Sequence, residues 1–387
     1  MAWIIPENKL DAQQRDFIDN VNIESENMWI KGFPGSGKSV LLVYTVKRIL
    51  ARNPSASIAV VVFTRSLVEM FETAFRELNV RVQVVTANSF AKTYDVYDYV
   101  LCDEVQDLST SMVRLMRNHG RHLIIAGDPN QSIYENDLVF RAEPTVRPQE
   151  LPTILGGREF ELNIIHRLTR SIINAVQQLV PNMNILSAKV DLTKQDTQIR
   201  LCEATSQNEE VKYVMQEARK AVEHGYSSGV LMSGIQSVLS FINTMLELEG
   251  KSMWVPTLNQ WGKPDMGALN RYLASQGIPL QYVGNGYGNL NLVEKKITLM
   301  TYHSAKGLDF DNVFLPFCNA GLYLANNEGI AKTLFMVGMT RSRNNLYITY
   351  HGYSSDYLNA FRGNCQVISI GGQTPPPFTT PSNPWGF

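Results

Sequence analysis

A glycine-rich run in the first part of the sequence ends in lysine and serine, a combination suited to holding phosphate. Residues 32–39 read Gly-Phe-Pro-Gly-Ser-Gly-Lys-Ser and fit the pattern GxxxxGK[ST]. Glycines let backbone N–H groups curl around a phosphate, and a helix that begins near Gly37 turns its positive end toward that anion. The Lys38 ammonium would reach the β- and γ-phosphates, and the Ser39 hydroxyl would hold Mg²⁺. The run therefore predicts an ATP or GTP site lined by Gly32, Gly35, Ser36, Gly37, Lys38 and Ser39.

Two adjacent carboxylates follow an apolar run later in the chain. Asp103 and Glu104 come directly after residues 97–102, which have the composition of a buried strand. Beside a phosphate loop, Asp103 can hold Mg²⁺ through water, and Glu104 can orient and deprotonate an attacking water. Taken alone, an acidic pair after a strand is more often a solvated helix start. Together with the phosphate loop, the pair indicates hydrolysis as well as binding.

These residues must be positioned by alternating strands and helices. Short β-branched apolar runs alternate with longer amphipathic stretches, the pattern of a parallel sheet covered by helices. In the first part, strands are expected at 28–31, 58–63, 80–85, 97–102 and 122–126, with helices at 39–51 and 66–78. In the second part, strands are expected at 199–202, 229–232, 279–283, 297–302, 312–315, 346–350 and 366–370, with helices at 168–179, 209–224, 237–248 and 329–340.

This rhythm predicts an α/β protein with two domains in tandem. Residues 141–157, rich in proline and glycine, are expected to form a hinge, so the domains are placed at 1–150 and 151–370. A small insertion is expected near 250–267, where proline, glycine and two tryptophans interrupt the pattern. The proline-rich stretch 371–387 is expected to be disordered or a polyproline-type docking peptide.

Composition excludes several classes of protein. The 387 residues carry a net charge of −1, so no global positive field indicates nucleic acid, although a local groove would suffice to bind a strand. Four widely spaced cysteines form no metal motif and indicate reduced thiols. The longest apolar run, 58–63, is too short to span a bilayer, and the first residues lack the pattern of a signal peptide. We therefore expect a soluble, cytoplasmic protein.

Several further motifs occur in a fixed order along the chain. They are LDAQQ at 10–14, VFTR at 62–65, TANSF at 86–90, GDPNQSIY at 127–134, LNIIHR at 162–167, TYHSAKGLDF at 301–310 and VGMTRSR at 337–343. In this order, and with the phosphate loop and the acidic pair, the sequence resembles the superfamily-1 helicases of the UvrD/Rep type over most of its length. The resemblance implies two tandem RecA-like domains that hydrolyse ATP between them.

For the nucleotide, the resemblance assigns a role to residues of both domains. Gln14 would contact adenine, Gln131 would sense the γ-phosphate, and His166 would stack on the base where the family has tyrosine. Arg167 and Arg341 would reach the phosphates from the second domain, with Arg341 as the arginine finger. Gly307 and Asp309 would face the nucleotide, and Asp309 stands where the family has glutamate. The catalytic residues implied are Lys38, Asp103, Glu104, Gln131, Arg167 and Arg341, with Ser39 and Asp103 as Mg²⁺ ligands.

The resemblance also implies contacts to single-stranded nucleic acid, with DNA favoured over RNA and 3′→5′ movement. The residues concerned are Thr64, Arg65, Ser89, Phe90, Tyr134, His303 and Lys306. Hydroxyls, amides and arginine suit phosphates, whereas aromatic rings suit bases. For Phe63 and Phe90 a place in the core is an equally good interpretation.

The sequence also departs from this family. The spacings leave no room for large accessory domains, and Asn136 and Asp137 stand where the family has an aromatic residue and an arginine that hold the strand. Loss of a stacking platform costs about 1–3 kcal/mol of strand affinity. Two hypotheses therefore stand: a minimal ATP-dependent translocase or helicase, and a nucleotide-gated ATPase switch that controls a protein partner such as a nuclease.

Overall fold

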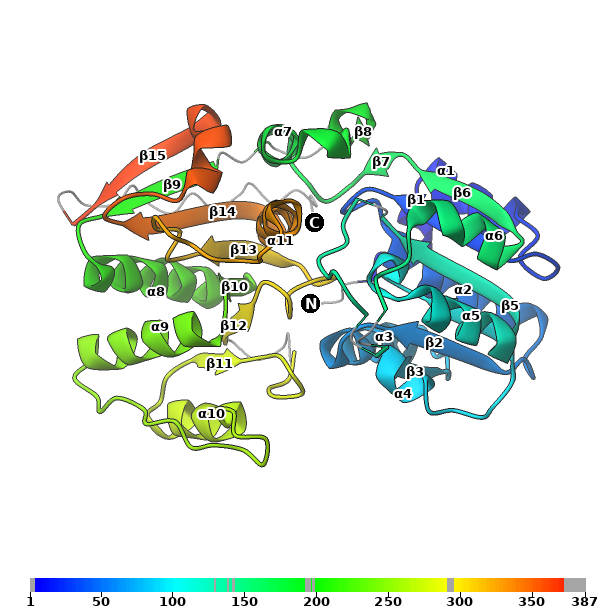
Figure 1. Cartoon of the computed structure of the whole chain (residues 1–387), viewed down its shortest axis with the longest axis horizontal. Helices are drawn as coiled ribbons and strands as arrows, with labels where there is room; N and C mark the ends of the chain where they lie inside the picture. The colour runs from blue at the N-terminus through cyan, green and yellow to red at the C-terminus, as the bar shows by residue number, and fades with distance from the viewer. Residues whose placement is uncertain are drawn as a thin grey trace. The chain divides into compact units, whose positions relative to one another are not determined.

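The computed structural model describes residues 4–128, 130–137, 139–140, 143–191, 196, 199–290 and 296–371 (Figure 1). Contacts divide the chain into two compact units, Met1–His166 and Arg167–Phe387. The proline-rich stretch from residue 372 onward lies outside the described residues. Within the described part, no helix combines the length and apolar character needed to cross a membrane.

The first unit is a parallel sheet covered by helices on both faces. Its helices and strands are η1 (Glu7–Lys9), α1 (Ala12–Asn20), β1 (Met28–Gly32), α2 (Lys38–Arg52), β2 (Ile58–Val62), α3 (Arg65–Glu77), β3 (Gln83–Thr86), α4 (Ala87–Phe90), β4 (Tyr97–Cys102), η2 (Val105–Asp107), α5 (Thr110–His119), β5 (Gly120–Gly127), η3 (Pro148–Glu150), α6 (Leu151–Leu155), β6 (Arg158–Leu162) and β7 (Ile164–Ile165). The six-stranded sheet has the order β3-β2-β4-β5-β1-β6, and its pairings are all parallel. The carboxyl ends of its strands therefore share one edge.

The two faces of this sheet bury different helices. On one face, Val61, Val100 and Ile125 pack with α5 and α6 in a hydrophobic cluster that includes Met112 and Leu151. Helices α2 and α3 contact the strands as well and belong to the other face. Strand β2, which reads Ile-Ala-Val-Val-Val, is buried along its whole length, as expected for a central parallel strand.

The second unit has the same plan with one strand added. Its helices and strands are α7 (Arg170–Leu179), η4 (Pro181–Met183), η5 (Ile185–Ser187), β8 (Lys189–Val190), β9 (Ile199–Ala204), α8 (Gln207–Glu223), β10 (Ser228–Met232), α9 (Ile235–Leu248), α10 (Met266–Ser275), β11 (Leu280–Tyr282), β12 (Ile297–Thr301), β13 (Phe310–Leu315), α11 (Glu328–Met339), β14 (Ser342–His351), η6 (Asp356–Ala360), η7 (Arg362–Asn364) and β15 (Cys365–Ile370). The sheet order is β11-β12-β10-β13-β14-β9-β15, again with parallel pairings.

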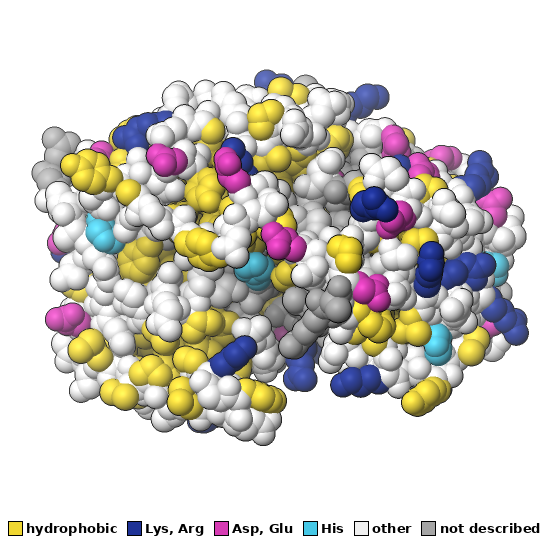
Figure 2. Space-filling model, viewed as in Figure 1, with side chains coloured by type: hydrophobic (Ala, Val, Ile, Leu, Met, Phe, Trp, Pro, Cys, Tyr) yellow, Lys and Arg dark blue, Asp and Glu magenta, His cyan; other side chains and the backbone are white. Residues whose placement is uncertain are grey.

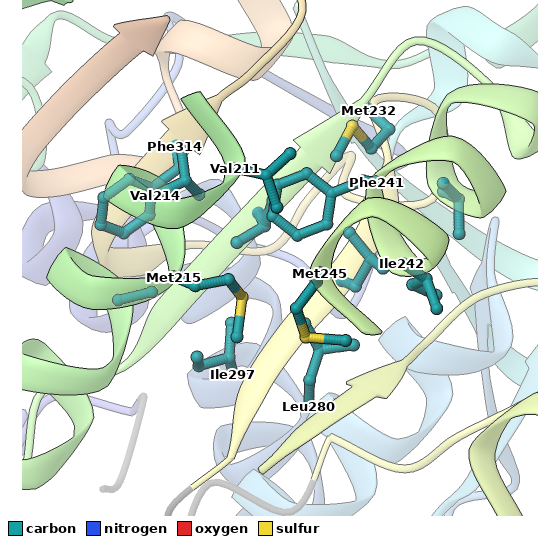
Figure 3. Close-up of a cluster of buried hydrophobic side chains, with 14 of the residues drawn as sticks. Val211, Val214, Met215, Met232, Phe241, Ile242, Met245, Leu280, Ile297 and Phe314 are labelled. Carbon is teal, nitrogen blue, oxygen red and sulfur yellow. The ribbon is translucent and has the colours of Figure 1, made fainter. Parts of the chain in front are cut away.

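The core of the second unit lies between the sheet and helices α8 and α9. Figure 3 shows side chains of α8 and α9 meeting residues of four strands, among them Met232, Leu280, Ile297 and Phe314. Alternate residues of β13 face opposite ways: Phe314 belongs to this cluster, whereas Leu315 contacts Gly338 of α11. Burial of such side chains contributes about 25 cal/mol per Å² of apolar surface.

The predicted α/β class with parallel sheets is confirmed, and each expected strand overlaps an observed one. The edge strand β6 was not expected, because its sequence Arg-Glu-Phe-Glu-Leu is too polar for a buried strand. Since β6 pairs with β1, the contacts divide the chain after His166 and not after residue 150. Residues 146, 151 and 155 of the expected hinge are buried in the core of the first unit.

The stretch near 250–267 is an ordered loop that leads into α10. The buried Trp254 holds its start, because Asn243 accepts a hydrogen bond from the Trp254 N–H at 2.9 Å. Leu258 and Pro264 form an isolated antiparallel bridge, and Asp265 caps α10. On the face shown in Figure 2, basic and acidic side chains are interspersed, in agreement with the net charge near zero.

Candidate nucleotide site and arginine cluster

The predicted phosphate loop connects β1 to α2 at the carboxyl edge of the first sheet. Gly35 and Gly37 have positive φ angles of 75° and 87°, a conformation that residues with a Cβ rarely adopt. Gly37 is the N-cap of α2 and has no side chain, so no side-chain cap accepts a hydrogen bond from the first N–H groups of this helix. The Lys38 Nζ donates to the carbonyl oxygens of Gly32 at 2.7 Å and Phe33 at 3.0 Å. The loop and its lysine thus have the form expected of a phosphate cradle.

Ser39 and Asp103 meet beside this loop. The Ser39 hydroxyl donates to Asp103 Oδ2 at 2.6 Å, although 64 residues separate them in sequence. Burial and the charge of the neighbouring Glu104 raise the pKa of Asp103 to about 6, although Ser39 and Lys38 act to lower it. A hydroxyl and a buried carboxylate are hard oxygen donors, so the pair fits Mg²⁺, which binds one or two such groups together with substrate phosphates.

Glu104 follows Asp103 with an unusual backbone. Its φ of 55° and ψ of 42° are left-handed, which is rare for a residue with a long side chain. Its carboxylate accepts a hydrogen bond from Gln106 Nε2 at 2.5 Å. The same Gln106 accepts a hydrogen bond from the backbone N–H of Asp128 at 3.2 Å. Sequence reasoning missed Gln106, although it is part of the run Asp-Glu-Val-Gln-Asp.

The predicted sensor, Gln131, lies in the loop after β5, which pairs with β4. Its Nε2 donates to Asp128 Oδ2 at 2.7 Å, and its backbone N–H donates to the Asp128 carbonyl. Burial raises the pKa of Asp128, while Lys38 and Gln131 lower it. The charges of Lys38 and Glu104 both act on the pKa of Asp128, so Asp128 lies within the electrostatic field of the phosphate loop. Gln131 is therefore near the loop but is held on Asp128.

Gln14 packs against the phosphate loop. It forms a capping box with Asp11 at the start of α1, and its Nε2 donates to the Ser36 carbonyl at 3.2 Å. A Cβ on Gly37 would clash with Gln14 Nε2. Both ends of the Gln14 amide have backbone partners, so Gln14 braces the phosphate loop, and its contact with adenine stays a prediction.

His166, the last residue of the first unit, is also bound to this loop. Its backbone N–H donates to the Gly35 carbonyl at 3.0 Å, and its Nε2 lies 2.6 Å from Asp11 Oδ2. Burial acts to raise the pKa of Asp11, but the hydrogen bonds from His166 and Gln14 lower it overall. The residue expected to stack on the base is thus positioned beside the loop.

The nucleic-acid candidates of the first unit occupy the same edge. Strands β2 and β3 pair with Val62 opposite Thr86, so the loops that follow them are neighbours. Thr64 caps α3 through the N–H of Leu67, and the Arg65 and Ser89 side chains are exposed. These three residues are available to contact a nucleic-acid strand.

The two aromatic candidates are less accessible. Phe90 is 1% exposed and packs with Tyr97 and His119, so its predicted stacking role is corrected to a core role. The Tyr134 ring packs on Phe63 with centroids 5.0 Å apart, and burial raises its pKa strongly. Asp137, noted above as a departure, is also structural, because its carboxylate accepts from three backbone N–H groups, those of Ser109, Val139 and Phe140.

In the second unit, Asp309 gathers two arginines at the amino ends of β13 and β14. Arg343 donates to Asp309 Oδ1, and Arg167 Nη1 lies 3.6 Å from Oδ2. Burial acts to raise the pKa of Asp309, but Arg343 and Arg167 lower it to about 2. Asp309 therefore holds arginines, a role that the expected position facing the nucleotide did not include. Arg343 was missed by sequence reasoning, although it follows Arg341 closely.

Arg341 is 2% exposed and is held by oxygens of its own unit. Its guanidinium donates to the carbonyls of Val337 at 2.9 Å and Leu308 at 3.0 Å, and to the Thr340 hydroxyl at 3.0 Å. Gly307 has a φ of 79° and forms the turn before Leu308. These contacts place the predicted finger beside Asp309, whose pKa it also lowers.

His303 and Lys306 lie in the loop after β12. Burial lowers the pKa of His303, as does the charge of Lys306. Lys306 is 1% exposed, so a contact to a strand requires that its side chain become uncovered. The loop is shaped by Thr301, whose hydroxyl accepts a hydrogen bond from the Ser304 N–H at 3.2 Å.

The first unit thus has the elements of a P-loop nucleoside triphosphatase: a phosphate loop, a hydroxyl–carboxylate pair and an adjacent glutamate at the carboxyl edge of a parallel sheet. Comparisons with known families agree. A family model described as AAA domain matches residues 14–137, and one described as UvrD-like helicase C-terminal domain matches residues 278–353. The two matches cover parts of the first and second units, and they make the chain similar to the superfamily-1 helicases of the UvrD/Rep type.

Curated relatives carry helicase names. A putative ATP-dependent DNA helicase of Acanthamoeba polyphaga mimivirus is 25% identical over 316 residues, which are 76% of this chain and 40% of that protein. A probable DNA helicase II homolog of Mycoplasma capricolum is 29% identical over 147 residues, 35% of this chain and 19% of that protein. The chain thus matches less than half the length of either relative. Among solved structures, an arterivirus nonstructural protein 10 helicase aligns with a TM-score of 0.46 and 14% identity, covering 88% of this chain and 62% of the other.

Proposed function

We propose that this chain is an ATP-dependent translocase or helicase that hydrolyses ATP and moves along single-stranded DNA. The observation that carries the proposal is the common sheet edge. The phosphate loop after β1, the acidic pair after β4 and the exposed Arg65 and Ser89 beyond β2 and β3 all stand at the carboxyl ends of one parallel sheet. Hydrolysis and strand binding would therefore act on the same rigid element. The helicase names of the relatives support this assignment.

ATP binding would use groups that are already positioned. Lys38 now contacts loop carbonyls, and the β- and γ-phosphates would replace these weak partners with charged ones. The N–H groups at the start of α2 would donate hydrogen bonds to the same anion. Ser39 and Asp103 would hold Mg²⁺, which neutralises phosphate charge when it is bound.

Hydrolysis would depend on Glu104 and Gln131. The Glu104 carboxylate would orient a water molecule and accept its proton. Gln131 would exchange its contact with Asp128 for the γ-phosphate, so that the loop after β5 responds to ATP. We further propose that Arg341 and Arg167 of the second unit supply positive charge to the same triphosphate, as the family resemblance implies.

ATP turnover measured with and without single-stranded DNA tests the proposal. The wild-type chain should hydrolyse ATP faster when DNA is added. Glu104→Gln should lower turnover about 10²–10⁴-fold while still binding ATP, because only the general base is lost. Glu7→Gln, an exposed change that affects only the salt bridge to Lys47, is the matched control and should retain full turnover. Turnover that is indifferent to DNA would contradict the translocase and favour a gated switch.

A further inference from the structure

A buried glutamine joins the candidate general base to the loop that carries the candidate phosphate sensor. Gln106 is 3% exposed and lies in η2, directly after the acidic pair. Its Nε2 is 2.5 Å from Glu104 Oε2, and its Oε1 is 3.2 Å from the backbone nitrogen of Asp128. The two contacts connect the carboxyl ends of β4 and β5, which are neighbouring strands.

The chemistry of the two contacts requires a carboxamide at this position. The carboxylate of Glu104 accepts hydrogen bonds, whereas the Asp128 N–H donates one. Gln106 meets both needs in one orientation, because its amide has a donor at one end and an acceptor at the other. Glutamate would offer two acceptors, and a shorter or apolar side chain would lose one or both contacts.

The backbone at Glu104 makes such a contact important. Its left-handed conformation, with φ of 55°, costs on the order of 1–3 kcal/mol in a residue with a side chain. A carboxylate on a flexible side chain would sample several rotamers, and only one would face a water molecule correctly. Asp103 and Asp128 share the electrostatic environment of this carboxylate, because the charge of Glu104 raises the pKa of both.

A second observation points to the same contact. Gly127 ends β5 beside Gln106, and a Cβ built on Gly127 would clash with Gln106 Oε1 and come within 2.9 Å of Val105 Cγ1. Its φ is not positive, so conformational freedom does not explain a glycine here. The absent side chain leaves room for the Gln106 amide to reach the Asp128 N–H.

We infer that Gln106 is a positioning residue that fixes the Glu104 carboxylate and couples it to the Asp128–Gln131 loop. The inference rests on the proposed ATPase function. When the γ-phosphate draws Gln131 away from Asp128, the displacement of the Asp128 backbone is passed through Gln106 to Glu104. The base is thereby aligned when ATP is present.

Steady-state kinetics and ATP binding of the full chain test this inference. Gln106→Glu and Gln106→Ala should each lower kcat about 10²-fold, the cost of a misaligned reacting group, while Kd for ATP and KM change less than about threefold. Gly127→Ala leaves residue 106 a glutamine but crowds its amide, so this substitution should reproduce the loss of kcat. The split between kcat and KM separates positioning from general damage.

Asn27→Ala is the matched control. Asn27 is another buried carboxamide of the first unit and lies at the opposite edge of the sheet. It bridges two backbone groups: it donates to the Leu155 carbonyl at 2.7 Å and accepts from the Leu123 N–H at 2.8 Å. It should lose stability like Gln106→Ala but keep its kcat at temperatures where it is folded. Unchanged kcat in folded Gln106→Ala would overturn the inference alone. Absence of turnover in the wild-type chain would overturn the proposed function and the inference with it.

Discussion

Asp103 is a buried carboxylate beside a second acidic residue. It is 2% exposed, it accepts a hydrogen bond from the neutral Ser39 hydroxyl, and Glu104 follows it directly in the sequence. Burial raises its pKa to about 6 from the ordinary 3.8. Two neighbouring carboxylates in a low dielectric repel each other, and a bound divalent cation would relieve that repulsion.

This shift predicts how stability depends on pH in the metal-free protein. Since the folded-state pKa lies above the unfolded value, the group stabilises the fold below pH 4, and that contribution is lost as pH rises through 6. Asp103→Asn should remove this dependence and raise the free energy of unfolding at pH 7.5 by on the order of 2 kcal/mol. Urea unfolding in EDTA at pH 5 and 7.5 measures it, with exposed Asp19→Asn as control. A variant no more stable than wild type at pH 7.5 would refute the prediction.

At the scale of elements, the beginning of α3 presents a cation at the sheet edge. Thr64 caps the helix and Arg65 opens it with an exposed side chain, while Arg76 is exposed in the last turn of the same helix. The two arginines share a helix and differ in which edge of the sheet they approach. Comparing substitutions of the two therefore distinguishes a local contact to a nucleic-acid strand from an effect of the general surface charge.

Arg65→Ala should weaken binding of single-stranded DNA and reduce the dependence of log Kd on log salt by about one phosphate contact, a slope change of about 0.7. Arg76→Ala removes an equal charge from the far end of α3 and should leave both quantities nearly unchanged. Fluorescence anisotropy of a labelled oligonucleotide across a salt series measures them. Equal effects of the two substitutions would show that no specific contact exists at Arg65.

In the second unit, Glu210 joins α8 to the carboxyl ends of β13 and β14. It is fully buried and accepts hydrogen bonds from the Phe317 N–H at 2.7 Å and the Thr349 hydroxyl at 2.5 Å, and its Oε2 lies 2.6 Å from His351 Nδ1. Phe317 has a φ of 60°, so the network also holds a strained residue.

Glu210→Ala should lower the free energy of unfolding by about 3–5 kcal/mol, because it leaves a buried N–H, a hydroxyl and an imidazole without their acceptor. Glu209→Ala, at the partly exposed neighbour on the same helix, should change it by less than about 1 kcal/mol. Chemical denaturation followed by circular dichroism gives both values. A loss below about 1 kcal/mol in Glu210→Ala would show that the network is dispensable.

For the molecule as a whole, the two units share a strand order but differ in their first loop. Leaving aside the additional β11, β12-β10-β13-β14-β9-β15 corresponds to β3-β2-β4-β5-β1-β6. Phe317 stands after β13 as Glu104 stands after β4, and both have positive φ. However, a five-residue loop precedes α2, whereas only Thr205 and Ser206 separate β9 from α8. The first unit alone has a phosphate loop among the described residues.

We therefore expect nucleotide to stabilise the chain through the first unit. A non-hydrolysable ATP analogue with Mg²⁺ at about 100 times its Kd should add about 2.7 kcal/mol to the free energy of unfolding. Lys38→Ala should abolish most of this gain, whereas Lys332→Ala, at a partly exposed lysine paired with Glu328 in α11, should not. Thermal melts at several analogue concentrations measure the effect. A full gain in Lys38→Ala would contradict the assigned site.

The sequence by itself determined the expected strands and the chemistry of the phosphate site. Periodicity located the strands, and residues 32–39 with Asp103 and Glu104 predicted the phosphate site, because these signals are local and depend on residue type. It did not determine contacts between distant segments. The pairing of Ser39 with Asp103, the bridge from Gln106 to Asp128 and the burial of Phe90 all depend on which strands become neighbours. Strand order is decided by packing over the whole sheet, so only the tertiary structure could show that Phe90 is core and that Gln106 and Arg343 belong to the sites.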